Sequence, residues 1–373
     1  MFILDGGSYC LLPSQFSITF NEQLADCLDQ LKNNSQSQIY KVNFFVDVNS
    51  AGNYQSIKQL LEKEVLNYFS SPVLCNVIAQ CPANGNILAE VHYFDDKIWN
   101  QKLIVADQGT ALLFQKEDVS VVVGQVQSSD FGSCHKNSHC AFTVMKGLLK
   151  LVGFEMNNVM RQWNYIENIL GCDNRMQRYQ QFNNIRSVFY NNSFKDHGYP
   201  AATGIGTYFG GVQIEFLAIK SPDIISLPVD NPLQVAAHCY SHASLDQSCE
   251  VKLTPKFERA RYLELKHKKQ LLISGTASIK GEKTVSQGDV IEQTINTIAN
   301  IQALFKDEIL KECQAFRSFN SGGARVYLKN RKFYPEVKQV VDLEFKNLPI
   351  IYLVTDICRK DLLVEIEGYM NIE

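Results

Sequence analysis

The spacing of hydrophobic residues predicts alternating strands and helices along most of the chain. Residues 39–48 have the pattern of a buried strand, and the apolar positions that follow within 57–66 recur at the spacing of an amphipathic helix. A second helix is predicted over 144–165, where apolar residues again lie three and four positions apart. The other strands expected in this half cover residues 73–79, 87–94, 102–106, 111–115 and 119–126.

The second half has a clearer pattern. A strand is expected over 271–279, and Asp289 can then cap a long helix. After it we expect a strand over 324–329, a helix over 335–345, and strands over 350–357 and 362–369. This order partly repeats that of the first half. We therefore predict an α/β (α+β) chain of two related domains, residues 1–155 and 156–373, each a mixed sheet with helices packed on one face.

Composition and charge exclude several classes of protein. The 373 residues suit about two domains, and 45% hydrophobic with 20% charged residues is typical of a globular protein. The 36 basic and 39 acidic residues nearly balance, which argues against a nucleic-acid binder or a protein held on anionic membranes. No apolar run approaches the roughly 18 residues of a membrane helix, and the first residues lack the features of a signal peptide. Eleven cysteines without a C-x-x-C pair indicate reduced thiols, so we expect a cytoplasmic protein.

Three motifs suggest a cofactor but fit poorly. Cys134, His135, His139 and Cys140 lie within CHKNSHC, where adjacent Cys-His pairs cannot easily converge on one zinc ion, so we interpret the segment as a polar loop with buried thiols. His238 and His242 have the spacing of metal ligands on a helix, but turn residues surround them. The G-x-G-x-x-x-G run over 204–210 precedes a predicted strand, whereas a dinucleotide site needs a helix there. We predict no metal site.

Seven short segments between residues 160 and 370 occur in an order and at separations that together identify a family, although one of them alone would be weak evidence. They resemble, in order and spacing, motifs of the chorismatase family, which comprises chorismate hydrolases and 3-hydroxybenzoate synthases built on the YjgF/RidA-type fold. The segments are RQWNYIENI from Arg161, RYQQFNNIR from Arg178, PAATGIG from Pro200, NPLQV from Asn231, PKFERA from Pro255, LISGTASI from Leu272, and DICRKDLLVEIE from Asp356.

The resemblance implies a function. It implies two YjgF/RidA-like domains and conversion of chorismate to 3-hydroxybenzoate and pyruvate, without a metal or redox cofactor. Hydrolysis of chorismate to a dihydroxycyclohexadiene carboxylate and pyruvate is the alternative. A non-catalytic small-molecule-binding protein of the same fold is another, and the imine deamination of the small stand-alone relatives is a remote one. Those relatives use trimer interfaces, whereas a fused chain can form the cleft internally and act as a monomer.

The sequence departs from the family pattern at several positions. Ile185 stands where the family usually has Gly, and Leu233 stands where it usually has Arg. The family's Tyr-x-Tyr-Pro is replaced over 238–241, and about five extra residues precede Pro255. If the missing arginine normally holds a substrate carboxylate, the departures affect affinity or substrate choice.

Glu365 is the predicted catalytic acid. In VEIEG, the two-residue period of a strand places Glu365 and Glu367 on one face, and a carboxyl on a largely apolar strand has a raised pKa. Release of pyruvate requires protonation of the enolpyruvyl methylene carbon, which needs such an acid. The family's catalytic glutamate matches Glu365. The resemblance also assigns Cys358 to the outcome of the reaction, because a Cys at this position accompanies formation of 3-hydroxybenzoate. A buried packing thiol is the alternative.

Chorismate carries two carboxylates, so cationic partners are needed. Arg178, Tyr179 and Arg186 are candidate partners for the carboxylates and hydroxyl groups of the substrate. Arg178 and Arg186 lie eight residues apart, and we expect both on one side of a helix with Tyr179 pointing elsewhere. Arg161 and Tyr165 either face the same cleft or join the domains. The weaker substrate-binding candidates are Tyr240, Arg259 and Thr276. We expect the cleft between the two halves to hold the site, with Glu365 and the 178–186 segment in one pocket.

Overall fold

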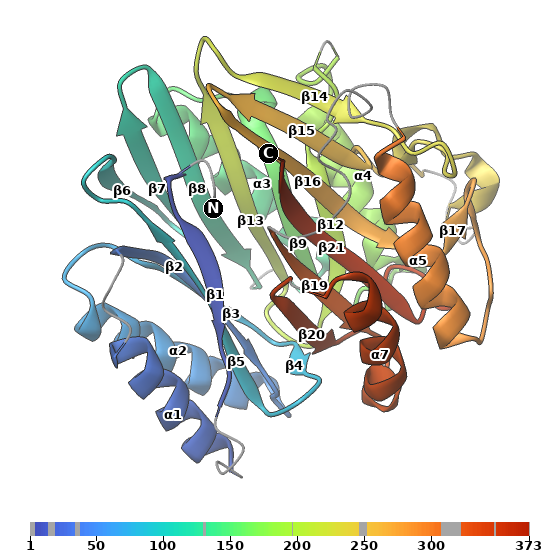
Figure 1. Cartoon of the computed structure of the whole chain (residues 1–373), viewed down its shortest axis with the longest axis horizontal. Coiled ribbons are helices and arrows are strands. Elements are labelled where there is room, and N and C mark those ends of the chain that lie inside the picture. Colours follow the sequence, from blue (N-terminus) through green and yellow to red (C-terminus); the bar gives the residue numbers. More distant parts are fainter. Residues whose placement is uncertain are drawn as a thin grey trace.

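The computed structural model describes residues 4–13, 19–33, 38–129, 132–195, 197–245, 252–306, 322–346 and 348–372. Within these residues the strands form three main sheets, of four, six and seven strands, and two short two-stranded ladders. The sheets lie toward the centre of the molecule and the helices lie outside them (Figure 1). None of the described helices is long and apolar enough to cross a membrane.

The first unit carries the four-stranded sheet, which α1 and α2 cover. Ser50 caps α2 by accepting a hydrogen bond from the amide of Asn53. The short strand β4 leaves this unit and pairs with β20 of the seven-stranded sheet. The elements are β1 (Gly7–Leu11), α1 (Phe20–Asn33), β2 (Gln38–Val46), α2 (Ala51–Tyr68), β3 (Leu74–Ile78), β4 (Cys81–Pro82) and β5 (Ile87–Phe94).

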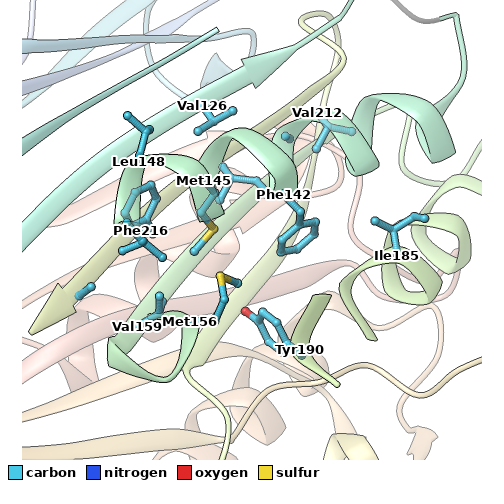
Figure 2. Packing of buried hydrophobic residues seen from close by; sticks show 14 of the residues in the cluster. Val126, Phe142, Met145, Leu148, Met156, Val159, Ile185, Tyr190, Val212 and Phe216 are labelled. Atoms are coloured by element: carbon cyan, nitrogen blue, oxygen red, sulfur yellow. The ribbon is translucent and has the colours of Figure 1, made fainter. Parts of the chain in front are cut away.

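The second unit carries the six-stranded sheet, which α3 and α4 cover. Apolar side chains of α3, among them Phe142, Met145 and Leu148, lie over the sheet residues Val126 and Phe216 (Figure 2). The elements are β6 (Asn100–Ala106), β7 (Gly109–Lys116), β8 (Val119–Ser128), α3 (Cys134–Leu151), β9 (Val159–Glu167), β10 (Cys172–Asp173), β11 (Met176–Gln177), α4 (Arg178–Tyr190), β12 (Ala201–Thr207) and β13 (Val212–Lys220).

The third unit carries the seven-stranded sheet, which α5 and α7 cover. Asp289 caps α5, as predicted, by accepting a hydrogen bond from the amide of Glu292. The elements are β14 (Ile225–Val229), β15 (Ala260–Leu265), β16 (Lys268–Ala277), β17 (Ile279–Lys280), β18 (Lys283–Thr284), α5 (Val290–Leu304), β19 (Gly322–Leu328), α7 (Tyr334–Glu344), β20 (Ile350–Val354) and β21 (Val364–Ile372).

The three described units share one topology. In each, the strand after the first helix pairs in parallel with the strand after the second helix: β2 with β3, β9 with β12, and β19 with β20. The last strand of the unit then lies antiparallel between that pair and the strand before the first helix. The second and third units extend this core with two further strands. The chain is therefore built from three related units arranged around a centre.

The predicted mixed sheets with helices on one face are confirmed, and most predicted elements lie where expected. Residue 155, the predicted domain boundary, lies between α3 and β9 inside the second unit, whose sheet takes strands from both sides of it. The sheets change instead between β5 and β6 and between β13 and β14. The grouping of these units into two domains stays a prediction.

The helix predicted over 144–165 is wrong. Helix α3 begins at Cys134 and ends at Leu151, and β9 follows from Val159. Gly153, in a left-handed conformation with φ of 75°, ends the helix because the amides of residues 152–154 bond to the carbonyl groups of its last turn. The CHKNSHC segment forms the first turns of α3, capped by Ser133, and is not a loop.

Three buried ion pairs join the described units where the sheets meet. Each carboxylate comes from the last strand of one unit, and each cation comes from the preceding unit in the chain. The third unit supplies the cation for the first, which closes the cycle. We call these six side chains the central ring. Breaking one buried pair by removing a partner typically costs about 3–5 kcal/mol. The pairs are Lys41–Glu215 (2.9 Å between Nζ and Oε2), Arg161–Glu367 and Arg325–Glu90.

Candidate active site

A cavity lies between the second and third units. Its walls come from α4 and β12 on one side, and from β16, β21 and the loop before β21 on the other. The connection between β14 and β15 forms part of the wall. The space between these walls, counted with its open mouth, is about 800 Å³.

Glu365 lies in the wall of this cavity, on β21. Its side chain is 4% exposed, and none of the described residues donates a hydrogen bond to its carboxyl group. Burial raises the pKa of Glu365 to about 8, and the negative charge of Glu367 adds to the effect while Arg161 opposes it. Glu365 therefore carries its proton at neutral pH and has that proton available for a ligand.

Glu367, two residues along the same strand face, is bound on both oxygens. Thr203 donates to Oε2 (2.5 Å) and Arg161 also binds this oxygen. Tyr327 donates to Oε1 (2.6 Å), and Arg325 approaches the same oxygen at 3.3 Å. Two carboxyl groups on one strand thus have opposite surroundings, which suits one as a proton donor and the other as a fixed anion.

Gly275 makes room for the Glu365 carboxyl. A Cβ atom at this position would lie 2.2 Å from Oε1 of Glu365. The residue lies in the irregular stretch of β16 between Ile273 and Thr276, where the pairing with β21 shifts. Only glycine allows the acid to lie this close to the backbone of the neighbouring strand.

Arg186, Arg259 and Arg359 line the same cavity. Arg186 donates to Asn183 (2.7 Å), and Arg259 donates to Tyr240 (2.7 Å). The Nε atoms of Arg186 and Arg259 are buried without a partner. These three arginines form no ion pair with a described carboxylate, so their charge is available to an anionic ligand.

The structure corrects two expectations: that Arg178 faces the same side as Arg186, and that Tyr179 points elsewhere. The substrate-binding role of Tyr179 stays a prediction. Tyr179 lines the cavity with Arg186, whereas Arg178 lies outside it and binds Asp173 (2.9 Å) and the carbonyl of Glu167. Seven residues turn a helix by about 700°, close to two full turns, whereas eight residues leave about 80° between side chains. Gly204 on β12 gives space to the Tyr179 ring, since a Cβ there would lie 2.9 Å from it.

Tyr240, Arg259 and Cys358 line the cavity, as predicted for side chains that contact a ligand. Burial raises the pKa of the Cys358 thiol to about 12, and the nearby Glu365 adds to the effect. The thiol is therefore neutral at physiological pH and is unsuited to act as a thiolate nucleophile.

Thr276, Arg161 and Tyr165 do not line this cavity. Thr276 donates to the carbonyl of Ser274 (2.9 Å). Arg161 belongs to the central ring, and Tyr165 donates to Glu215 there (2.8 Å). These contacts agree with the alternative in which Arg161 and Tyr165 join one part of the fold to another. Both residues lie on strand β9, not on the helix predicted for this segment.

Two of the sequence departures, Ile185 and Leu233, do not line the cavity, whereas Tyr240 of the altered 238–241 segment does. The segment that holds the extra residues before Pro255 includes 246–251, which lie outside the described residues. Ile185 packs in the core beneath α4, and Leu233 is 41% exposed without lining the cavity. His238 and His242 lie in two separate single-turn helices. In the described part of the chain, no group of three or more His, Cys, Asp or Glu side chains is placed to hold a metal ion.

Sequence reasoning missed two contributors to the site, Arg359 and Gly275. Arg359 stands next to Cys358, and its place in the DICRKD segment was a signal that went unused. For Gly275, a glycine inside a strand pattern often marks a bulge or a close approach, but the group that approaches requires the fold.

Comparisons with known proteins agree on one family. The family model described as "Chorismatase FkbO/Hyg5-like, N-terminal" matches residues 97–218. A 3-hydroxybenzoate synthase of Streptomyces hygroscopicus is 32% identical over 246 residues, which cover 62% of this chain and 68% of that protein. A chorismatase of the same organism is 27% identical and covers 73% and 78% of the two chains.

A solved chorismatase structure has the same fold. It superposes with a TM-score of 0.73 at 20% identity and covers 98% of each chain. Together with the identity to the 3-hydroxybenzoate synthase and the matching family model, this result leads to one assignment: the chain belongs to the chorismatase family.

Proposed function

We propose that this chain is a chorismatase that converts chorismate to 3-hydroxybenzoate and pyruvate, with Glu365 as the acid. One observation carries the proposal: a buried, proton-bearing carboxyl without a hydrogen-bond partner among the described residues shares a cavity with three arginines. A dicarboxylate with an acid-labile enolpyruvyl ether needs both features. The relatives named above support the same substrate.

The acid step has a defined proton balance. Glu365 donates its proton to the methylene carbon of the enolpyruvyl group, which becomes the methyl group of pyruvate. The bond between the ether oxygen and the ring breaks, this oxygen becomes the keto oxygen of pyruvate, and the ring hydroxyl supplies the oxygen of 3-hydroxybenzoate. The two products together contain all atoms of chorismate, so the reaction consumes no water. The proton lost as the ring becomes aromatic returns, directly or through solvent, to Glu365. A positioned acid of this kind contributes about 10²–10⁴-fold to the rate.

The arginines are proposed to hold the two carboxylates. Arg186 reaches the cavity from α4 in the second unit, whereas Arg259 and Arg359 belong to the third. A ligand held between the two sides has its position fixed relative to Glu365, which is where most of the benefit of orientation arises. Tyr179 and Tyr240 supply hydroxyl groups to the same wall.

Cys358 is proposed to favour the aromatic product. Its neutral thiol lies in the wall with Glu365 and occupies space that a water molecule would otherwise take. Exclusion of water disfavours hydrolysis to the dihydroxycyclohexadiene carboxylate, the alternative outcome. The raised pKa also leaves the thiol able to donate a hydrogen bond during the ring chemistry.

The assembly and location of the protein are also proposals. Two units of the same chain supply the opposite walls of the cavity, which supports an enzyme that acts as a monomer. The near balance of 36 basic and 39 acidic residues supports a protein without a nucleic-acid or membrane partner. The described cysteines are free thiols, which supports a cytoplasmic protein.

The test is incubation of the purified protein with chorismate. Pyruvate is measured with a coupled dehydrogenase, and the ring products are separated by chromatography. We expect equal amounts of pyruvate and 3-hydroxybenzoate, with no loss of rate after EDTA because carbon protonation is Brønsted chemistry. Pyruvate with a dihydrodiol would select the hydrolytic alternative, and no release of pyruvate would refute the proposed activity.

A further inference from the structure

The side chains of Glu365, Thr203 and Glu367 follow one another from the cavity to the central ring. The Glu365 carboxyl and the methyl group of Thr203 both lie against the backbone of Gly275, since a Cβ there would be 2.2 Å from the former and 3.3 Å from the latter. The hydroxyl of Thr203 points the other way and donates to Glu367 (2.5 Å). A single methyl-bearing side chain thus lies between the two glutamates.

Glu367 is held in place by hydrogen bonds on both of its oxygens. Its four donors come from β9, β12 and β19, and include the guanidinium groups of Arg161 and Arg325. Its side chain is 2% exposed. These contacts fix the position of the carboxyl group behind Thr203.

We propose that Glu367 is a positioning residue for the reaction: its fixed negative charge, held behind Thr203, keeps the neighbouring Glu365 in the proton-bearing form that donates to the substrate. This inference rests on the proposed function of Glu365. It gives the central ring, which otherwise joins the units, a role in the chemistry.

Of the charged groups around Glu365, Glu367 is the one that favours the protonated form of its carboxyl group. Arg161 from β9 opposes protonation of Glu365. Three further cations line the same cavity: Arg186 from α4, Arg259 from the residue before β15, and Arg359 from the loop before β21. Tyr179 and Cys358 also face the cavity, but burial raises the pKa of each, so both are neutral. Among the described residues, Glu367 is the anion that acts on the pKa of Glu365.

The direction of the effect on pH dependence follows. The donor is active when protonated, so pyruvate release should fall as the pH rises through the pKa of Glu365, near 8. Removal of the negative charge at Glu367 lowers this pKa, although burial still holds it above the value of an exposed glutamate. We expect the alkaline limb to move down by about one pH unit, which lowers the rate about tenfold above the limb.

The experiment compares pH profiles of kcat/KM for pyruvate release, which report the acidic and basic groups of the free enzyme. Glu367→Gln should move the alkaline limb, the fall in rate near the pKa of Glu365, to lower pH. Its rate on the low-pH plateau should stay close to that of the wild type. Glu367→Asp keeps the charge and should restore the wild-type limb. The matched control is Glu215→Gln, which removes the equivalent carboxylate of the central ring in another unit and should leave the limb in place. An unmoved limb in Glu367→Gln, or an equal shift in Glu215→Gln, would overturn the inference.

A second variant covers loss of folding. In Glu367→Gln/Arg161→Gln both partners of a buried pair are removed, so neither is left as an unpaired charge toward the other. Because Glu367 outweighs Arg161 at Glu365, the limb should still move to lower pH, by less than in the single variant. A limb that stays or rises contradicts the inference.

Failure of the proposed function is distinguishable from failure of this inference. If wild-type protein releases no pyruvate, or if Glu365→Gln retains the full profile, the function assigned to Glu365 is wrong. If Glu365→Gln abolishes release while the Glu367 variants keep the wild-type limb, only the role of Glu367 is wrong.

Discussion

Two clefts of this molecule occupy equivalent places in the repeated topology, but only one has the side chains for catalysis. The cavity with Glu365 lies between the second and third units. Its counterpart lies between the first and second, lined by α2, β3, β8 and β13. Gln213 opposes Tyr165 across its strands as Glu365 opposes Tyr327. An amide that cannot donate a carboxyl proton thus stands where the other cleft has its acid.

The other side chains that line the two clefts also differ, and again only the cavity with Glu365 has the features of a binding site. Gln125 and Gln127 extend from β8 into the counterpart cleft, whereas Gly275 and Ala277 leave that space open on β16. On α2, Lys58 binds Glu62 (2.6 Å), and no arginine lines this cleft among the described residues. The comparison teaches that the repeated fold supplies a cleft, while an acid, unpaired arginines and small residues beside the acid make it a site.

Replacement of the acid should have the largest effect. Glu365→Gln keeps the shape but cannot donate a carboxyl proton, so pyruvate release should fall by at least about 10²-fold. Binding of chorismate, measured by calorimetry, should change little. The matched control, Gln213→Ala in the counterpart cleft, should keep the wild-type rate. Full activity of Glu365→Gln would remove the basis of the comparison.

Closing the space beside the acid should be nearly as costly. Gly275→Ala places a methyl group where Glu365 now lies and forces the carboxyl to move. A displacement of about 1 Å at a catalytic group costs on the order of 10²-fold in rate. We expect a loss of kcat with a smaller change in KM. Unaltered kcat would show that the acid tolerates displacement.

Arginine variants should separate binding from chemistry. Arg186→Met removes a charged donor of the cavity and should raise KM about 10–100-fold, the usual range for hydrogen bonds to a charged group. Arg178→Met is the control on the same helix, since Arg178 binds Asp173 outside the cavity. If the two variants raised KM equally, helix α4 would act through its stability and not through a ligand contact.

Cys358→Ala should change the product more than the rate. Glu365 remains, so pyruvate still forms, and the freed space admits a water molecule if polar partners are present. We expect less 3-hydroxybenzoate and more dihydrodiol by chromatography, with the pyruvate rate altered by less than about tenfold. Cys75→Ala, a thiol of the counterpart cleft, should leave the product ratio unchanged. An unchanged ratio in Cys358→Ala would reduce Cys358 to a packing residue.

The sequence predicts this fold well where one face of an element is apolar. The strand at β2 and the helices α2, α5 and α7 follow directly from periodicity and from the cap at Asp289. It fails where a boundary depends on a single residue, as at Gly153 between α3 and β9. The third related unit was missed because the first unit lacks the two outer strands and shares no clear residue identity with the others.

The site was predictable in part for a similar reason. Glu365 and Glu367 share a face by simple alternation, but their opposite surroundings depend on Thr203 and Arg161, which are distant in sequence. Tyr179 needed only correct helix arithmetic. Arg359 reaches the cavity through a loop whose course no local pattern describes.

The central ring ties the first unit to a cavity that this unit does not line. None of the described residues that line the cavity precedes Gln177, so a shortened gene that encodes only the second and third units would still supply all of them. Such a product would carry Glu215 without Lys41 and Arg325 without Glu90, although Arg325 would keep its contact with Glu367 (3.3 Å). The apolar residues of the other units that pack against Tyr40, Leu74 and Phe94 would also be exposed to water. The protein thus resists trimming to a minimal catalyst, and a reduced form would first need polar replacements on the surface that the first unit covers.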